Sequence, residues 1–469
     1  MSMLRSMRIR LGLHEVGSLF GLDDGRCYFR FDDAYATDAQ RPVLSQLYCA
    51  STEDRTLAQL LNPALAVNRG DGKGGLPPFF QNLLPEGQLR KHLIQRAGLA
   101  PDDEFGLLAY CGKDLPGDVS AIAEQLEERD MGRLLGQGHD SYEMSSGQLP
   151  LPEGESLSGV QPKMALVREA GGRYVMRSKD RSGSHFIGKL PASDYPQMPE
   201  VEFASLTLAA AAGVDVCKFE LAPLNAIADH LPFGLRNDAG HFLLVHRFDR
   251  DAPTPTGRLH MEDFAQITGT LPAAKYVGTY AAIGMVLLER STRGIEDLFE
   301  LLRRIKVNEL LGNFDAHLKN FSMLYRKPQQ ALLSPAYDIV AYAAYVGGNG
   351  HALAFVPGQK GKQLLTPAVL RQLANVWGIP EPKLQAVLVE TVDRAMRHWP
   401  GLIAQLPFSD AQRTRLSAHV DANASVLAWR RRTSRKSVLP GLPSLPTLPS
   451  GLNPDPATDN KKTDGKQQT

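Results

Sequence analysis

Apolar and polar residues alternate at the start of the chain, which predicts short strands. The runs RIRLGLHEVGSLFGL (8–22) and GRCYFRFDDAYA (25–36) have this pattern, and an Asp-Asp-Gly turn signal separates them. Glycines and paired prolines then predict a loop, followed by an amphipathic helix. The apolar residues assigned to that helix are Leu83, Leu89, Leu93 and Ile94. We therefore expect a mixed α/β subdomain at 1–127.

A second group of strands follows a polar stretch. Residues 136–156 are rich in Gly, Ser and Pro and predict a linker, which we place at 128–155. PKMALVREAGGRYVMRS (162–178) alternates around a Gly-Gly turn, the pattern of a β-hairpin. Three more runs predict strands: HFIGKL (185–190), KFELAPL (218–224) and HFLLVHRF (241–248). Between them PEVEFASLTLAAAAG predicts a helix that ends at Gly213, so a small sheet with one helix is expected at 156–250.

Helical periodicity dominates the last part of the folded chain. YVGTYAAIGMVLLER (276–290) and IEDLFELLRRIKVNELLGN (295–313) place their apolar residues on one face, and more helices follow. A helix-rich lobe is therefore expected at 251–430. The tail at 431–469 differs in composition, because basic residues precede prolines at every third position. Such a segment can form an extended polyproline helix for docking, but its composition favours disorder.

Composition narrows the class of protein. The chain has 469 residues, enough for two or three folded units. Its 52 Lys and Arg nearly cancel its 51 Asp and Glu, so the net charge provides no general attraction to nucleic acid or membrane. The 4 cysteines form no CxxC pair, which argues against a disulfide framework or a zinc site. No apolar run reaches the length of a membrane span or forms a signal core, so we expect a cytoplasmic protein.

The stretch NELLGNFDAHLKNFSMLY (308–325) carries the candidate chemistry. Phosphoryl transfer to a hydroxyl needs a carboxylate that orients the acceptor and takes its proton, and oxygen ligands that hold Mg²⁺ against ATP. Protein kinases use an Asp and an Asn five positions later, the spacing of Asp315 and Asn320. A hairpin of NFSMLY and ALLSPAYD would bring Asp338 to the same place. A single carboxylate more often caps a helix or loop, but the three together favour phosphoryl transfer.

The strand-rich lobe should supply a cation for the phosphates. Lys189 on the predicted strand HFIGKLP is the candidate, because a lysine presents a compact positive charge. Glu202 on the following helix could pair with it, as a kinase positions its lysine. Taken alone, each would more often be a solvated residue. Their order along the chain supports the assignment.

Several ordered motifs resemble the HipA family, the serine/threonine kinase toxins of bacterial toxin–antitoxin pairs. The motifs are SLSGVQPK (156–163), HFIGKLP (185–191), RFDR (247–250), DAHLKN (315–320) and YDIV (337–340). PFFQNLLPEG (78–87) and FGLLAYCGKDLPGDV (105–119) similarly resemble the N-terminal subdomain of that family. The resemblance spans roughly residues 1–430. It implies an α+β, bilobal protein-kinase-like fold with a small β-rich lobe, a large helical lobe and an N-terminal α/β subdomain.

The resemblance also implies roles for matching residues, with ATP and Mg²⁺ as cofactors. It implies Asp315 as the catalytic base, and Asn320 and Asp338 as Mg²⁺ ligands. Lys189 would contact phosphate, with Glu202 as its ion-pair partner. The implied nucleotide-binding residues are Val160, Gln161, His246, Phe248 and His317.

Two serines lie in the implied phosphate loop. Serines of this loop are autophosphorylation sites in the family, and Ser156 matches the modified position best, with Ser158 as a second candidate. A phosphate with a charge of about −2 would compete with ATP for the lysine and the backbone donors. The same serines could instead have been selected for turn formation.

Three functions remain as alternatives at this point. The first is an ATP-dependent kinase toxin that phosphorylates a protein of translation, such as an aminoacyl-tRNA synthetase. The second is a catalytically silent co-repressor that holds a DNA-binding antitoxin. The third is a metal-dependent hydrolase, which lacks the additional ligands of a two-metal site. The resemblance implies a helix-turn-helix, HipB-like antitoxin as partner, which would make the contact with operator DNA, and no membrane partner.

Overall fold

The computed structural model describes residues 4–22, 24–62, 64–125, 163–168, 173–176, 185–192, 195–227, 240–348, 350–359 and 361–437. Met1–Trp429 forms one compact unit and Arg430–Thr469 a second. The predicted linker, the implied phosphate loop before Lys163 and the proline-rich part of the tail lie outside the described residues. Within the described ranges, no helix has the length and apolar character needed to cross a bilayer.

The N-terminal region contains a four-stranded antiparallel sheet in the order β3-β2-β1-β4. Its strands are β1 (Leu4–Leu11), β2 (His14–Leu22), β3 (Cys27–Phe31) and β4 (Val119–Gln125). Alternation puts Phe29 and Phe31 of β3 in the core and exposes Tyr28, as the sequence pattern predicts. The helices of this region are α1 (Asp33–Thr37), α2 (Glu53–Leu60), α3 (Pro78–Gln81), α4 (Gly87–Ala97) and α5 (Glu104–Cys111).

The predicted amphipathic helix begins later than its first leucine. Leu83 is buried in the turn between α3 and α4, while Leu89 and Leu93 lie inside α4. Pro85 explains the difference, because a proline disfavours helical geometry in the residue before it. The apolar residues are therefore all in or near the core, but the helix is shorter than the pattern indicates.

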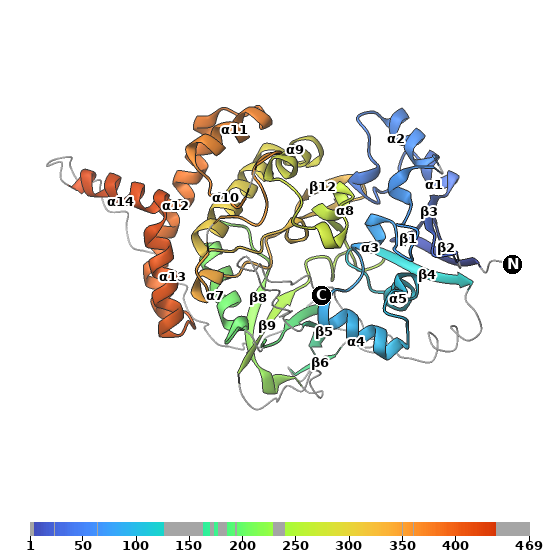
Figure 1. Cartoon of the computed structure of the whole chain (residues 1–469), viewed down its shortest axis with the longest axis horizontal. Coiled ribbons are helices and arrows are strands. Elements are labelled where there is room, and N and C mark those ends of the chain that lie inside the picture. Colours follow the sequence, from blue (N-terminus) through green and yellow to red (C-terminus); the bar gives the residue numbers. More distant parts are fainter. Residues whose placement is uncertain are drawn as a thin grey trace, which may run out of the picture. The chain divides into compact units, whose positions relative to one another are not determined.

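The second sheet has five strands in the order β6-β5-β7-β9-β8, and all neighbouring pairs are antiparallel. Its strands are β5 (Lys163–Arg168), β6 (Tyr174–Met176), β7 (His185–Lys189), β8 (Phe219–Pro223) and β9 (His241–His246). Helix α7 (Met198–Ala211) lies beside β8 and β9 (Figure 1) and ends just before Gly213. The predicted small sheet with one helix is confirmed.

The following region is mainly helical and also contains a three-stranded sheet in the order β10-β11-β12. Its helices are α8 (Phe264–Thr268), α9 (Tyr280–Arg290), α10 (Ile295–Leu311), α11 (Pro367–Trp377), α12 (Glu381–Gln405), α13 (Asp410–Ala422) and α14 (Ala424–Ser437). Its strands are β10 (His260–Asp263), β11 (Ser322–Lys327) and β12 (Gln330–Leu333). The predicted hairpin before Asp338 is β11 and β12, whereas β10 was not predicted.

Two helix ends differ from the sequence pattern. The helix expected from residue 276 begins at Tyr280, because the Thr279 side chain caps it by accepting from the Ala282 N–H. The last helix, α14, continues to Ser437, beyond the expected end of the helical region at 430. Short 3₁₀ helices occupy Gln46–Tyr48, Ala66–Asn68, Leu224–Ala226, Pro272–Ala274, Leu318–Asn320 and Tyr342–Ala344.

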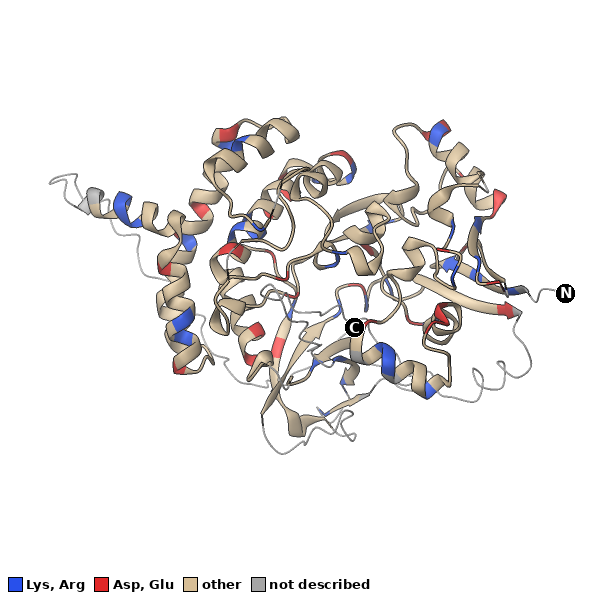
Figure 2. Ribbon diagram, in the orientation of Figure 1, with Lys and Arg blue, Asp and Glu red and all other residues tan. Residues whose placement is uncertain are grey.

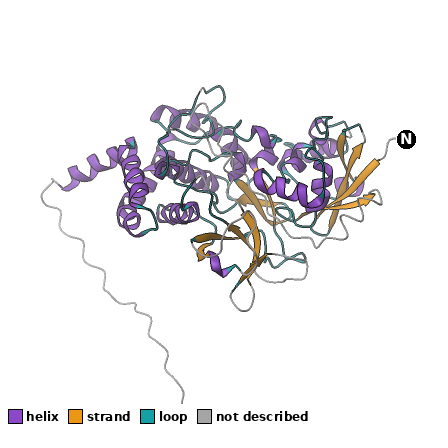
Figure 3. Ribbon diagram, turned by 60° about the horizontal axis from the view of Figure 1, so that its bottom comes forward, coloured by secondary structure: helices purple, strands orange, loops and turns teal. Residues whose placement is uncertain are grey.

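Helices α10 and α12 pack against α7 and so fix its position beside the five-stranded sheet. Trp399 of α12 is fully buried, and its indole N–H donates to the Leu208 carbonyl of α7 at 2.8 Å. Removing such a side chain typically costs about 3–5 kcal/mol. The described residues combine antiparallel sheets with helices (Figure 3), as in an α+β fold.

Candidate functional site

The loop 313–320 follows the C-terminus of α10. Gly312 adopts a left-handed φ of 60°, which ends the helix. The side-chain amide of Asn313 then donates to the Asp338 carbonyl at 3.5 Å, and its Oδ1 accepts from the Asp315 N–H at 3.4 Å. One asparagine therefore connects the loop with the segment that follows β12.

Asp315 lies buried in this loop beside a single hydroxyl donor. The hydroxyl of Tyr276 donates to its Oδ1 at 2.6 Å. Burial raises the pKa of Asp315 to about 7, although the Tyr276 hydrogen bond and the charge of Lys275 act in the opposite direction. A carboxyl group that titrates near neutral pH is suited to accept a proton from a hydroxyl.

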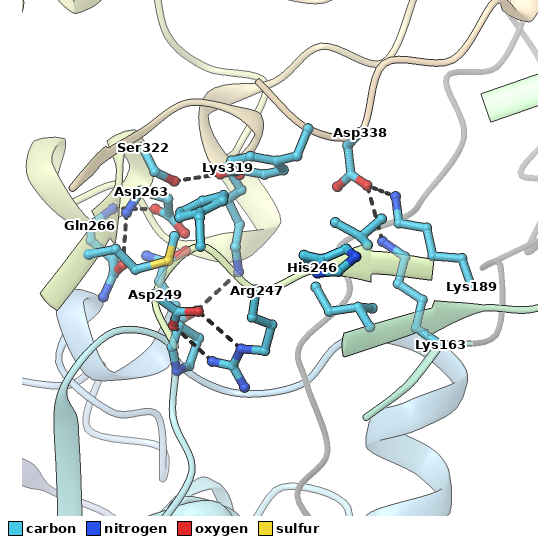
Figure 4. Close-up of a pocket in the computed structure, with 17 residues that line it drawn as sticks. Lys163, Lys189, His246, Arg247, Asp249, Asp263, Gln266, Lys319, Ser322 and Asp338 are labelled. Carbon is cyan, nitrogen blue, oxygen red and sulfur yellow. Dashed lines mark hydrogen bonds and ion pairs between the residues drawn. The ribbon is translucent and has the colours of Figure 1, made fainter. Parts of the chain in front are cut away.

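Asp338 brings the loop and the five-stranded sheet together. Its Oδ2 accepts from the Asn320 side-chain amide at 3.3 Å. Its Oδ1 pairs with the ammonium group of Lys189 and, at 3.4 Å, with that of Lys163 (Figure 4). Burial alone would raise the pKa of Asp338, but the two lysines hold it well below its usual range. The residue has a φ of 53°, a left-handed conformation that clusters at functional sites when it is not glycine.

The two lysines are cross-strand neighbours. Lys163 on β5 stands opposite Lys189 on β7, so both ammonium groups leave the same face of the sheet. Glu202, fully buried on α7, pairs with Lys189. Burial would lower the pKa of Lys189, but the two carboxylates raise it, whereas burial lowers the pKa of Lys163. Among the described residues, Lys189 thus pairs with two carboxylates and Lys163 with one.

His317 is fully buried in the same loop, and neither ring nitrogen has a hydrogen-bond partner among the described residues. Its ring meets the ring of Tyr276 edge-on, with the centroids 5.2 Å apart. Burial and the charge of Lys275 lower the pKa of His317 well below its usual range. Buried polar side chains nearly always have partners, so this imidazole is a candidate ligand-binding group.

The main cleft opens between the five-stranded sheet, the 313–320 loop and the segment 246–250 at the end of β9, which we call the hinge (Figure 4). It has about 870 Å³ of free space, part of which is open to solvent. Its lining includes Lys163, Lys189 and Asp338 together with the hinge residues His246 and Phe248. Apolar side chains combined with a few converging charges are typical of a ligand pocket.

The hinge residues have different surroundings. Phe248 lies 5.9 Å from Tyr337, measured between ring centroids, and both line the main cleft. The ring of His246 instead makes a 2.9 Å contact from Nε2 to Glu220 on β8 and packs edge-on against Phe186. A contact of His246 Nε2 with a ligand would therefore compete with Glu220.

A buried ionic cluster holds the hinge to the N-terminal region. Asp249 accepts from Arg247 and Arg250, and also from the Gly117 N–H at 2.8 Å. Arg250 reaches across to Asp114 at 2.9 Å. The RFDR motif therefore connects the hinge with the N-terminal region. Its residues Arg247 and Asp249 also line the main cleft.

A second connection joins the N-terminal region to the 313–320 loop. Glu86, at the start of α4, pairs with Lys319 at 2.6 Å and with Lys275 at 3.0 Å. Burial would raise the pKa of Glu86, but the two lysines lower it to about 2. The Lys319 ammonium also donates to the Asn82 carbonyl at 3.1 Å. This cluster was not predicted, because the sequence pattern does not show that α4 reaches the loop.

The structure brings together most of the sequence-predicted site residues that it describes. Hydrogen bonds and ion pairs between side chains join Asn320, Asp338, Lys189 and Glu202, and Asn313 links Asp315 to Asp338. The predicted residues Ser156, Ser158, Val160 and Gln161 lie outside the described residues. The sequence reasoning missed Lys163, Tyr276, Asn313 and Glu86 as members of the site.

The polar side chains of the site can be compared with the ligands that a metal ion needs. Within the described ranges, no group of three or more His, Cys, Asp or Glu side chains could hold a metal ion. Asn320 and Asp338 form a smaller set of amide and carboxylate oxygens. That set fits Mg²⁺, which usually takes one or two carboxylates and completes its shell with water and substrate phosphates.

Comparison with known proteins gives a consistent result. The family described as the HipA-like C-terminal domain matches residues 155–399, and the HipA N-terminal domain matches residues 7–122. Y4dM of Sinorhizobium fredii, named as a candidate kinase, is 36% identical over 405 residues, 86% of this chain and 93% of the relative. The serine/threonine-protein kinase toxin HipA of Shewanella oneidensis is 24% identical over 391 residues, 76% of this chain and 84% of the toxin.

A solved structure shows the same fold. HipA of Shewanella oneidensis, in a complex with HipB and its operator DNA, superposes with a TM-score of 0.62 at 19% identity. The match covers 91% of this chain and 99% of that chain. The predicted kinase-like α+β fold is thereby confirmed.

Proposed function

The chain belongs to the HipA family, and on this basis we propose that it is an ATP-dependent serine/threonine protein kinase, the toxin of a bacterial toxin–antitoxin pair. One observation carries the proposal. Asp338 contacts Asn320 of the loop and the lysines of the sheet at once, beside a buried Asp315 whose pKa is about 7. These are the groups that phosphoryl transfer to a hydroxyl requires.

Each residue has a role in this proposal. Asp315 orients the acceptor hydroxyl and takes its proton. Lys189 and Lys163 bind the phosphates of ATP as point charges, and Glu202 keeps Lys189 in place. The apolar hinge side of the main cleft, with Phe248, accepts the adenine ring. His246 then contributes through its backbone, because its ring is engaged with Glu220.

Remaining nucleotide contacts are proposed from the family. Val160 and Gln161 would cover the phosphates from the segment before β5, and His317, whose ring nitrogens have no partner among the described residues, would lie near them. Asn320 and Asp338 would hold Mg²⁺, which when bound neutralises charge on the phosphates. The Asp338 carboxylate also pairs with Lys163 and Lys189, which places these cations beside the proposed metal position.

Regulation and partners are part of the proposal. We propose autophosphorylation on Ser156 or Ser158, where the added charge would compete with ATP for the lysines. A HipB-like helix-turn-helix antitoxin would bind this chain and contact operator DNA. That division fits the described residues, in which basic and acidic side chains are interspersed (Figure 2). The target would be a cytoplasmic protein of the translation machinery, such as an aminoacyl-tRNA synthetase.

Phosphosite mapping tests the proposal. The purified chain is incubated with Mg²⁺ and ATP, ATP consumption is measured, and phosphoserine is located by mass spectrometry. We expect label on Ser156 or Ser158 that is lost in Asp315→Ala. Label of equal extent in that variant would overturn the role of Asp315. An antitoxin–DNA complex that assembles normally while neither ATP consumption nor label is found would favour a catalytically silent co-repressor.

A further inference from the structure

Residues 271–279 form a segment that packs along the 313–320 loop. The Tyr276 hydroxyl donates to Asp315 at 2.6 Å, and the Lys275 carbonyl accepts from the Leu318 N–H at 3.2 Å. Gly278 lies so close to Leu318 that an added Cβ would stand 2.6 Å from its side chain. This segment therefore holds the position of the proposed base through several independent contacts.

The same segment forms one wall of a second cleft, which we call the side cleft. Its other wall belongs to the N-terminal region, and its lining includes Gln81, Glu86, Arg90, Glu104, Lys275 and Tyr276. The side cleft has about 930 Å³ of free space and shares no lining residue with the main cleft. Asp315 itself is absent from the described lining of both clefts, but Tyr276, which donates to it, lines the side cleft, away from Lys163 and Lys189.

In-line phosphoryl transfer is compatible with an acceptor that enters from a different cleft than the nucleotide. The attacking hydroxyl and the leaving oxygen lie roughly in line on the phosphorus, so the acceptor does not share the path of the nucleotide. The Tyr276 hydroxyl connects the side cleft to Asp315 directly. The Glu86–Lys319 pair stands between the two clefts, since Lys319 lines the main cleft and Glu86 the side cleft.

The chemistry of the side cleft indicates what it would accept. Its charged residues are paired within the protein: Glu86 with Lys275 at 3.0 Å, and Arg90 with Glu104 at 3.4 Å. Beside it, Val277 is 74% exposed although both of its chain neighbours pack against the loop. A single exposed apolar residue is ordinary, but this one projects from the segment that positions the base.

We propose that the side cleft and Val277 bind the segment of a protein substrate that carries the acceptor serine or threonine. The acceptor hydroxyl reaches Asp315 past Tyr276, and an apolar side chain near it in sequence packs on Val277. This proposal rests on the proposed kinase function and adds the route and the sequence preference of the acceptor.

Positional scanning of acceptor peptides tests the proposal. The probe is a set of serine and threonine peptides in which each flanking position is varied in turn, with phosphate transfer from labelled ATP as the readout. Wild-type protein should prefer an apolar residue at one flanking position by about tenfold, the value of one well-packed apolar contact. Val277→Asp should change that preference to Lys or Arg, and Val277→Lys should change it to Asp or Glu. The preference within each variant is compared, so a general loss of activity does not imitate the result.

Leu13 provides a matched control. It is 72% exposed in the turn between β1 and β2, so Leu13→Asp introduces the same charge on a similarly exposed site. This variant should keep the wild-type preference. A preference that is the same in wild type and both Val277 variants would overturn the side cleft as the acceptor site and leave the kinase function intact. The same holds if the chain phosphorylates itself but no peptide. Absence of any ATP consumption or phosphate transfer by wild type would overturn both proposals.

Discussion

Two buried clusters beside the 313–320 loop each place one carboxylate between two lysines. Asp338 lies between Lys189 and Lys163, and Glu86 lies between Lys319 and Lys275. In both cases burial would raise the pKa of the carboxyl group, and the lysines lower it. Each cluster therefore has a buried carboxylate that contacts two lysines, although Lys189 of the first cluster also pairs with Glu202.

The two clusters differ in their surroundings, and therefore in whether their carboxylates can bind a ligand. The Asp338 cluster lines the main cleft, and Asp338 has a left-handed backbone conformation. His317, whose ring has no hydrogen-bond partner among the described residues, interacts electrostatically with Asp338. The Glu86 cluster connects two regions of the chain, and the Lys319 ammonium has an additional carbonyl partner in Asn82. We interpret the first cluster as one that exchanges its lysine contacts for ligands, and the second as a permanent connection.

The two clusters can be tested by replacing each carboxylate with its amide. The largest effect on phosphate transfer is expected at Asp338. Asp338→Asn removes a proposed metal ligand, and we expect phosphate transfer to fall by about 10³-fold, as when a group that stabilises transferring charge is lost. Folding should be retained, because Lys189 keeps Glu202 as its partner. Single-turnover phosphate transfer and a thermal unfolding curve provide the two measurements. A variant with near wild-type activity would remove Asp338 from the site.

Glu86→Gln should act mainly on stability. It leaves Lys275 and Lys319, whose side chains are 3% and 7% exposed, without a carboxylate, and breaking such a buried pair costs about 3 kcal/mol of unfolding free energy. The pKa of Glu86 is depressed from 4.5 to about 2, so its contribution is complete above pH 4.5 and is lost as the pH falls toward 2. The difference between wild type and variant should therefore narrow below pH 4.5 in urea titrations.

The surface pair of Arg8 and Glu124 provides the control for this change. The side chain of Glu124 is 38% exposed, and an exposed pair contributes under about 1 kcal/mol. Glu124→Gln should thus leave the unfolding free energy nearly unchanged. An equally small effect of Glu86→Gln would contradict the interpretation of the Glu86 cluster as a structural connection.

The sequence predicted one of the two clusters and not the other. Asp338 and Lys189 were expected together because kinase-type spacing and an ordered series of motifs connect residues that are far apart in the chain. Glu86 belongs to a motif that resembles the family's N-terminal subdomain, but no periodicity indicates which surface α4 approaches. The contact with Lys319 joins residues more than 200 positions apart and depends on how two regions pack.

The positions of Lys163 and Tyr276 in the site could not be predicted from the sequence, for related reasons. Lys163 is the last residue of the motif SLSGVQPK, yet its place beside Lys189 follows from the register of β5 and β7, which a sequence pattern leaves open. Tyr276 was read as the first turn of a helix, whereas the Thr279 cap starts that helix at Tyr280 and leaves Tyr276 on the segment beside Asp315. Most helices and strands were thus predictable from the sequence. The contacts between them were predictable only where a family motif indicated them.

Lys163→Met should have a smaller effect than either amide. It removes one of two proposed phosphate cations, and we expect the affinity for a non-hydrolysable Mg²⁺–ATP analogue to fall about tenfold, the value of one charged hydrogen bond. Calorimetric titration measures the change. Lys327→Met removes an equal charge from an exposed position on β11 and should leave the affinity unchanged. Unchanged or tighter binding in Lys163→Met would mean that this lysine only neutralises Asp338.

Tyr276→Phe should give the smallest change, a shift in pH dependence. The carboxylate form of Asp315 is the active one, so kcat/KM should rise with pH through the pKa of about 7 in the free protein. Among the groups that face Asp315, Tyr276, Lys275 and Lys163 lower this pKa, and burial and Asp338 raise it. Loss of the hydroxyl should therefore move the acidic limb of the profile to higher pH.

A purely structural role of Tyr276 would reduce kcat at every pH without moving that limb. Tyr345→Phe is the matched control, because its hydroxyl donates to the Pro196 carbonyl at 2.9 Å instead of to a carboxylate. It should leave the profile in place. If the acidic limb stays near pH 7 in both variants, the Tyr276 hydroxyl does not tune Asp315, and the connection from the side cleft to the base depends on the backbone contacts of the segment alone.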